Sequence, residues 1–237
     1  MKKTNLFLLF GFLFFLQSCV NMLPNDAPKT HADHVTEKRE TLPFFGISVD
    51  NGINVYLNYG PQARIEVQAE AKVLPHIQTD VRNGLLNVFV NGHTSSNRPI
   101  NVYVTYQNLS QIHASTAAKI WINSPLKNNS THIQSSTGSQ ITIRQIDTDF
   151  LYIESSAKIQ ITGSAGLLNA QINSGEIDAA QLIVDRCQAE LLHNAFLSLH
   201  VLNEINANLS ENANLKIFGQ PKIQNIQRPG IRPQPVR

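Results

Sequence analysis

The sequence predicts an all-β chain that folds as a single-domain β-solenoid, right-handed β-helix-like, with short coils of about 18–21 residues. From Pro43 onward, apolar and polar residues alternate with period two, which is typical of half-buried strands. Turn signals such as Asn51-Gly52 and Asn83-Gly84 separate these strands. In the second half, a strand–turn–strand unit recurs about every 20 residues, and such a fixed period indicates stacked coils.

The composition excludes several function classes. Charged residues make up 15% of the chain and the formal net charge is +2. Lys2 and Lys3 belong to a segment that we expect to be removed, so the mature chain is neutral and we expect no nucleic-acid partner. Two cysteines provide neither a disulfide framework nor a zinc cluster, and we expect no cofactor and no metal.

Residues 1–18 have the pattern of a lipoprotein signal peptide. Lys2 and Lys3 precede an apolar run from Leu6 to Leu16, which is long enough for a signal sequence and too short to span a bilayer. The run ends in Leu16-Gln17-Ser18-Cys19, which resembles the lipobox of bacterial lipoproteins. The resemblance implies that Cys19 is acylated and anchors the chain to the membrane. The alternative is an ordinary signal peptide with a chance cysteine.

The resemblance also bears on localisation. Val20 follows the lipidated cysteine, and the absence of aspartate there favours the outer membrane in lipoproteins of this kind. We expect a cell-envelope protein that is either surface-exposed or periplasm-facing.

Residues 19–42 show no periodicity, and we interpret them as the lipidated cysteine followed by a flexible tether. His31, Asp33 and His34 are potential metal ligands within it, but solvated polar sequence is the simpler reading. At the other end, residues 225–237 are basic and proline-rich, which predicts a disordered tail. Binding of lipid headgroups or an acidic polymer is the alternative for that tail.

The repeats predict which side chains line the interior. The leading aliphatic residues of successive units are expected at Ile112, Ile133, Ile153, Ile172, Leu191 and Leu209. Two inward ladders are expected. One consists of Ile120, Ile141, Ile159, Ile177, Leu197 and Leu215, and the next consists of Ile122, Ile143, Ile161, Ala179, Leu199 and Ile217. The outward row between them is expected at Trp121, Thr142, Gln160, Asp178, Ser198 and Lys216. Small residues between the aliphatic groups suit tight corners, namely Ser115, Ser135, Ser136, Ser155, Ser156 and Ser174.

Four segments in order carry a family resemblance. Phe45 to Val55 contains a Gly-Ile-Asn signature, and Val81 to Val88 contains an Asn-Gly hairpin. Val102 to Leu109 is a strand before the repeats, and Ala207 to Pro221 is a closing motif of small residues, a strand and Gly-x-Pro. The set resembles the GIN-domain family of autotransporter-adhesin heads and covers residues 43–224. It implies a β-helical, lipoprotein-like domain and supplies no catalytic residues.

Trp121 is the main candidate for a binding surface. It lies between inward-facing Ile120 and Ile122, so it should point outward, and an exposed tryptophan suits a sugar ring or a partner protein. Tyr103 and Tyr106 share a strand and are predicted to extend this surface. The alternative for Trp121 is stacking on neighbouring side chains.

Three carboxylates are candidate catalytic groups, because some β-helices cleave polysaccharides. Glu176 and Asp178 lie on the same side of one strand, and Glu154 is expected near them in the preceding coil. A solvated polar face is the simpler interpretation. The unpaired Cys187 is expected to be a small buried apolar residue.

The sequence therefore predicts an envelope-anchored lipoprotein with a non-catalytic binding, adhesin-like or scaffolding solenoid. Its expected partners are the membrane, through Cys19, and a glycan or an envelope or host protein. The alternatives are a carbohydrate-active enzyme and a periplasmic envelope-assembly or stress factor.

Overall fold

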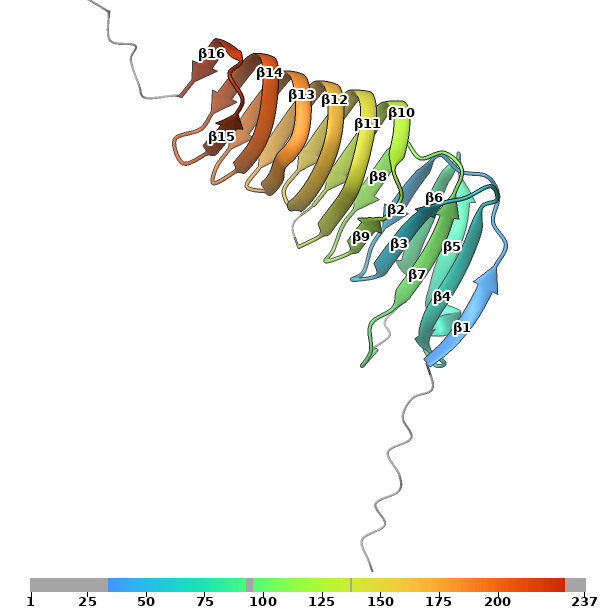
Figure 1. Ribbon diagram of the computed structural model, residues 1–237. Coiled ribbons are helices and arrows are strands. Elements are labelled where there is room, and N and C mark those ends of the chain that lie inside the picture. Colours follow the sequence, from blue (N-terminus) through green and yellow to red (C-terminus); the bar gives the residue numbers. More distant parts are fainter. Residues whose placement is uncertain (1–33, 93–95, 137, 229–237) are drawn as a thin grey trace, which may run out of the picture. The chain divides into compact units, whose positions relative to one another are not determined.

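The computed structural model describes residues 34–92, 96–136 and 138–228, all within one compact unit. Its strands form one 16-stranded sheet that winds into successive coils (Figure 1). Cys19 and the potential metal ligands His31 and Asp33 lie outside the described residues. The predicted all-β solenoid is confirmed.

Short strands build the N-terminal part. They are β1 (His34–Arg39), β2 (Gly46–Val49), β3 (Asn54–Tyr59), β4 (Arg64–Glu70), β5 (Ile77–Arg82), β6 (Leu85–Val90), β7 (Asn101–Tyr106), β8 (Gln111–Ala114) and β9 (Lys119–Ile122), with a 3-10 turn η1 (Leu74–His76). β1 pairs antiparallel with β4, β4 with β7, and β5 with β6. β2 pairs in parallel with both β6 and β8, and β3 pairs in parallel with both β7 and β9.

Long strands build the C-terminal coils, and each wraps around a corner of the solenoid (Figure 1). They are β10 (Leu126–Ser135), β11 (Gln140–Ser155), β12 (Lys158–Asn173), β13 (Glu176–Leu192) and β14 (Phe196–Leu209), followed by β15 (Asn214–Phe218) and β16 (Lys222–Gln227). Neighbours pair in parallel, and the register shifts at the corners, for example between Ile143 and Ile146. Because each coil buries its apolar face only against its neighbours, the core is one continuous column.

One predicted inward ladder agrees with the register throughout. Ile120 pairs with Ile141, and the series continues through Ile159, Ile177, Leu197 and Leu215. Its members are buried except for Leu215 in the last coil, which is partly buried. The predicted outward row from Trp121 to Lys216 follows the same register, but Ser198 in this row is buried.

The predicted alignment of the leading aliphatic residues is wrong at one step. Ile153 pairs with Ala170, and Ile172 pairs with Ser155. Residues 153 and 155 both face inward, and so do residues 170 and 172, so a shift of two residues keeps the alternation of inward and outward side chains. Aligning one aliphatic residue with the next therefore gave Ile153 the wrong partner. The corner accommodates the difference, because three residues separate Ile172 from Glu176 whereas two separate Ser155 from Lys158.

The extra corner residue lies in a left-handed turn. Ser174 has φ 62°, a conformation that Ala117 also adopts at an earlier corner with φ 63°. Ser135 and Ser155 are buried beside these corners, as predicted for small residues at a turn. Their hydroxyl oxygens lie 2.8 Å apart.

The domain begins earlier than residue 43. Residues 34–39, predicted as tether, form β1 in register with β4. The Arg39 guanidinium donates hydrogen bonds to the carbonyl oxygens of Ile77, at 2.6 Å, and Leu74, at 3.2 Å. The tether prediction failed here because β1 is polar and exposed, so it lacks the apolar alternation of the other strands. At the other end, β16 extends three residues past the predicted boundary at 224.

Candidate functional site

Three outward aromatic side chains form a stack on neighbouring parallel strands. Tyr56 on β3 lies between Tyr103 on β7 and Trp121 on β9, with ring centroids 5.1 and 4.8 Å apart. The interplanar angles are 17° and 9°. Burial raises the pKa of Tyr56, and Tyr103 raises it further. We call these three residues the aromatic stack.

The stack limits what Trp121 offers to a ligand. One face of its indole ring covers Tyr56, and both faces of Tyr56 are covered. The arrangement is the side-by-side stacking that the sequence left open as the alternative to a binding platform. Tyr103, at the end of the stack, also lines a hollow of about 690 Å³ with Lys38, Arg64 and Glu66.

Tyr106 does not belong to this surface, so that prediction is wrong. Its side chain is 2% exposed and lies in the core. Positions 103 and 106 differ by an odd number, so they point to opposite faces of the strand. Burial raises the pKa of the Tyr106 hydroxyl to about 12.

The candidate carboxylates separate onto two faces. Glu176 forms an ion pair with Lys158 at 3.2 Å, and Asp178 accepts a hydrogen bond from the Ser198 hydroxyl at 2.9 Å. Glu154 belongs to a different row, because it pairs in register with Gln171, whereas Glu176 and Asp178 pair with Lys158 and Gln160 at the other end of the same strand β12. The expected grouping of all three is therefore wrong.

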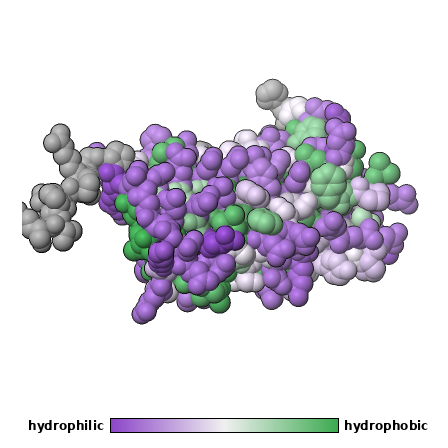
Figure 2. Space-filling view, turned by 90° about the horizontal axis from the view of Figure 1, so that it is seen from above, coloured by the Kyte–Doolittle hydropathy of each residue, from purple (hydrophilic) through white to green (hydrophobic). Residues whose placement is uncertain are grey.

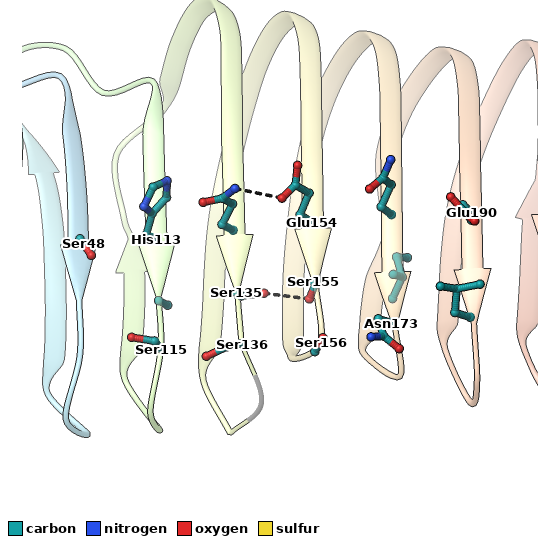
Figure 3. A pocket seen from close by; sticks show the side chains of 15 residues that line it. Ser48, His113, Ser115, Ser135, Ser136, Glu154, Ser155, Ser156, Asn173 and Glu190 are labelled. Atoms are coloured by element: carbon teal, nitrogen blue, oxygen red, sulfur yellow. Dashed lines mark hydrogen bonds between the residues drawn. The ribbon is translucent and has the colours of Figure 1, made fainter.

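Glu154 belongs to a different feature, a face covered with amide and carboxylate side chains. One row on this face, in register from coil to coil, consists of His113, Gln134, Glu154, Gln171, Glu190 and Asn208. The row beside it consists of His132, Tyr152, Asn169, Gln188 and Asn206. We call the two rows together the amide face. Figure 3 shows His113, Glu154 and Glu190 on alternate coils along it.

Short contacts order the first coils of this face. The Gln134 amide donates a hydrogen bond to Glu154 at 2.9 Å, and His132 Nε2 lies 3.6 Å from the same carboxylate. The His132 ring makes edge contacts with both His113 and Tyr152. Burial lowers the pKa of His113, the nearby His132 lowers it further, and Glu154 opposes this shift.

The amide face is hollowed along its length. A hollow of about 610 Å³ runs from Ser48 to Glu190, past the corner serines Ser135 and Ser155 (Figure 3). A second hollow of about 240 Å³ continues as far as Asn208. The two share Gln171 and Glu190, so together they form one groove that crosses successive coils. Hydrophilic residues likewise cover most of the surface seen in Figure 2, with apolar residues scattered among them.

Sequence reasoning missed the amide face, although a signal was present. The residue after each leading aliphatic is polar in the first three repeats, namely His113, Gln134 and Glu154. The two-residue slip at Ile153 then placed Asn173 in the row instead of Gln171. With the register corrected, every coil from β8 to β14 contributes a polar side chain at the same position.

The described residues contain no group of three or more histidine, cysteine, aspartate or glutamate side chains placed to hold a metal ion. Within the same ranges, no helix has both the length and the apolar character needed to cross a membrane. Cys187 is buried on β13, and burial raises the pKa of its thiol to about 12.

Comparison with known proteins identifies the family. A family model described as "Putative auto-transporter adhesin, head GIN domain" matches residues 43–221, which is most of the chain. The chain belongs to the GIN-domain family. A search of curated proteins found no match.

Solved structures show the same fold at low sequence identity. A "putative adhesin" from Bacteroides fragilis has a TM-score of 0.76 and 15% identity, over 83% of this GIN-domain chain and 93% of that chain. A "putative adhesin" from Parabacteroides distasonis has a TM-score of 0.62 and 20% identity, over 84% and 96%. A "putative lipid binding protein" from the same species has a TM-score of 0.64 and 14% identity, over 85% and 96%.

Proposed function

We propose that this GIN-domain chain is an envelope-anchored lipoprotein whose solenoid is a non-catalytic, adhesin-like binding module. The observation that carries the proposal is the groove of the amide face, where successive coils offer hydrogen-bonding side chains at one repeated position. A surface of this kind suits multivalent recognition of an extended ligand, because each coil adds one equivalent contact. Membership in the adhesin-head family supports the same reading.

Site-specific photocrosslinking in cells tests the binding module. A photoreactive residue replaces Gln171 on the amide face, and the matched control replaces Gln160, which lies on the same strand but on the other face. We expect covalent products of higher mass from position 171 and few from position 160. Equal yields at the two positions, or none at either, would contradict a specific binding face.

The membrane anchor rests on the N-terminal sequence. Lys2 and Lys3, the apolar run to Leu16 and the cysteine at position 19 together match a lipoprotein signal. Metabolic labelling with palmitate should mark the wild-type chain and the Cys187→Ser control, whereas Cys19→Ser should lose the label. Retained label in Cys19→Ser would refute the anchor.

The compartment decides between adhesion and the alternative of a periplasmic assembly or stress factor. An outer-membrane lipoprotein presents its domain to the medium or to the periplasm. Protease digestion of intact cells supports adhesion to external surfaces. Protection of the domain until the cells are lysed supports a periplasmic partner instead.

One observation favours a carbohydrate-active enzyme as the second candidate. Glu154 and Glu190 lie in the same groove two coils apart, which places them roughly 9 to 10 Å from each other. That separation is at the upper end of the range used by inverting glycosidases. Release of reducing sugar from a polysaccharide by the wild type, and its loss in Glu154→Gln, would establish the enzyme and exclude the non-catalytic module.

A further inference from the structure

We infer that the groove of the amide face takes a neutral, linear polysaccharide that lies across the coils, parallel to the solenoid axis, with about one sugar per coil. The inference rests on the proposed binding function and names the ligand class for the same face. Hydrogen bonding, charge, repeat length, apolar contact and the pairing of the groove floor each support it.

Hydrogen-bonding chemistry is the first argument. An amide side chain both donates and accepts, as a sugar hydroxyl does. The groove carries Gln134, Gln171 and Gln188, with Asn169, Asn206 and Asn208 alongside. Most of these side chains have no role in the core, since they point outward from strands whose alternate residues are buried.

The charge of the groove decides between neutral and anionic polymers. None of the described residues that line the two hollows is lysine or arginine. Glu154 and Glu190 both line the larger hollow. A uronate polymer, a nucleic acid or a phosphate-rich polymer would meet carboxylates without a compensating cation, so a neutral chain is favoured.

The repeat length of the face matches an extended sugar chain. Successive parallel strands lie about 4.8 Å apart, so equivalent side chains recur at that interval along the axis. This interval is close to the advance per sugar of an extended polysaccharide. A polymer in this orientation therefore meets the same kind of side chain at each sugar.

Tyr152 and His132 supply an apolar contact beside the hydrogen-bonding row. Tyr152 is 40% exposed, and the His132 side chain is 36% exposed. They lie two residues from Glu154 and Gln134 on their own strands, so they flank the groove on one side. Aromatic rings in such a place pack against the C–H faces of sugar rings.

The groove floor disfavours an extended peptide as the ligand. Its strands β10 to β13 each pair with a neighbour on both sides. A peptide that adds to a sheet needs an unpaired edge, which these strands do not offer to a ligand above them. Recognition at this face therefore uses side chains, as sugar binding does.

Affinity electrophoresis of the full chain in detergent tests the ligand class. The gels contain hydroxyethyl cellulose as the neutral linear polymer or polygalacturonate as the anionic one. We expect retardation by the neutral polymer only. In titrations with cello-oligosaccharides, affinity should rise with length from two to about five sugars. Absence of retardation by hydroxyethyl cellulose, or retardation by polygalacturonate alone, would overturn the inference.

Two variants on the same strand assign the binding to the groove. Gln171→Ala removes a side chain that both hollows share, and Gln160→Ala is the control on the opposite face. Losing one hydrogen bond should weaken neutral-polymer binding by roughly two- to twelvefold in Gln171→Ala. Gln160→Ala should match the wild type, and thermal unfolding should show both variants folded. Equal weakening in the two variants would overturn the assignment.

The two proposals fail separately. If hydroxyethyl cellulose does not bind but the photoreactive group at position 171 still gives specific crosslinks, the ligand class is wrong and the binding module stands. If position 171 gives no crosslinks and no polymer binds, both are wrong.

Discussion

Ile153 and Ala170 occupy the same inward position on successive coils, and two residues further along each strand Ser155 pairs with Ile172. Coils before this step carry a large residue first and a small one second, as in Ile133 and Ser135. In the coils after this step the small residue comes first and the large residue second. On the same strand, Ala170 precedes Ile172, Ala189 precedes Leu191, and Ala207 precedes Leu209. The interior volume of each coil is thereby kept nearly constant while the large side chain changes place.

Truncating the large member should therefore leave a cavity. Ile153→Ala is expected to lower the free energy of unfolding by about 2–5 kcal/mol. The control Gln140→Ala, exposed on the same strand, should change it by less than about 0.5 kcal/mol. Urea unfolding followed by circular dichroism measures both. Equal stability of the two variants would contradict the described packing.

Ser135 and Ser155, the small residues before this step, also contribute to the free energy of unfolding. Ser155 Oγ also accepts a hydrogen bond from the backbone N–H of Ala157 at 3.1 Å, so it ties the interior to the corner. Ser155→Ala should cost about 1–3 kcal/mol, because it leaves buried partners unsatisfied. Ser135→Ala combined with Ser155→Ala should cost less than the sum of the single changes, because both single variants lose the same contact. Additive costs in urea unfolding would show that the two hydroxyls do not interact.

Much of the fold could be predicted from the sequence, because period-two alternation and a 20-residue repeat follow directly from strand geometry. Ile120 and its successors were placed correctly since a turn with small residues precedes each of them. The register at Ile153 could not be predicted, because two neighbouring inward positions on one strand fit the apolar–polar alternation equally well. Only the volume of the packed side chains distinguishes these two positions.

The candidate site was less predictable than the fold. Trp121 is a candidate from the sequence because it is the single tryptophan of the chain. Its stacking on Tyr56 could not be predicted, because Tyr56 lies on a strand far away in sequence. Tyr106 can be excluded from the binding surface by its position alone, because it lies three residues from Tyr103 and so points to the other face of the strand. The amide face depends on register across coils, so no single motif reveals Gln171 or Glu190.

β1 provides a third prediction, about the N-terminal end of the sheet. Arg39→Ala removes the guanidinium hydrogen bonds to Ile77 and Leu74. Each hydrogen bond from a charged group contributes about 1.5–3 kcal/mol, so β1 should exchange its amide hydrogens faster. The coils from β11 to β14 should keep their protection, since coils in a solenoid contact only their neighbours.

Arg82→Ala is the control for this experiment. The Arg82 side chain is 78% exposed and pairs with Asp80 on the same strand. Hydrogen exchange of β1 should be unchanged in Arg82→Ala. Unchanged exchange of β1 in Arg39→Ala as well would show that Arg39 does not hold this strand.

Cys187 provides a pH-dependent prediction. Burial raises its thiol pKa from 9.0 to about 12, so the folded chain holds the thiol protonated at pH 8. Iodoacetamide should not modify Cys187 in the folded chain and should modify it in urea. Because the thiol pKa is higher in the folded chain than in the unfolded chain, the protonated thiol contributes to the free energy of unfolding fully below pH 9. This contribution is lost as the pH rises toward 12. Modification of Cys187 in the folded chain at pH 8 would contradict its burial.

Hydroxyl-radical footprinting of the full chain, with and without hydroxyethyl cellulose, tests most directly whether the amide face is the binding face. Tyr152 and His132 report on the amide face, and Trp121 reports on the aromatic stack. We expect the polymer to protect Tyr152 and His132 from oxidation and to leave Trp121 unchanged. Protection of Trp121 or Tyr103, with Tyr152 unchanged, would contradict this expectation and place the ligand on the aromatic stack.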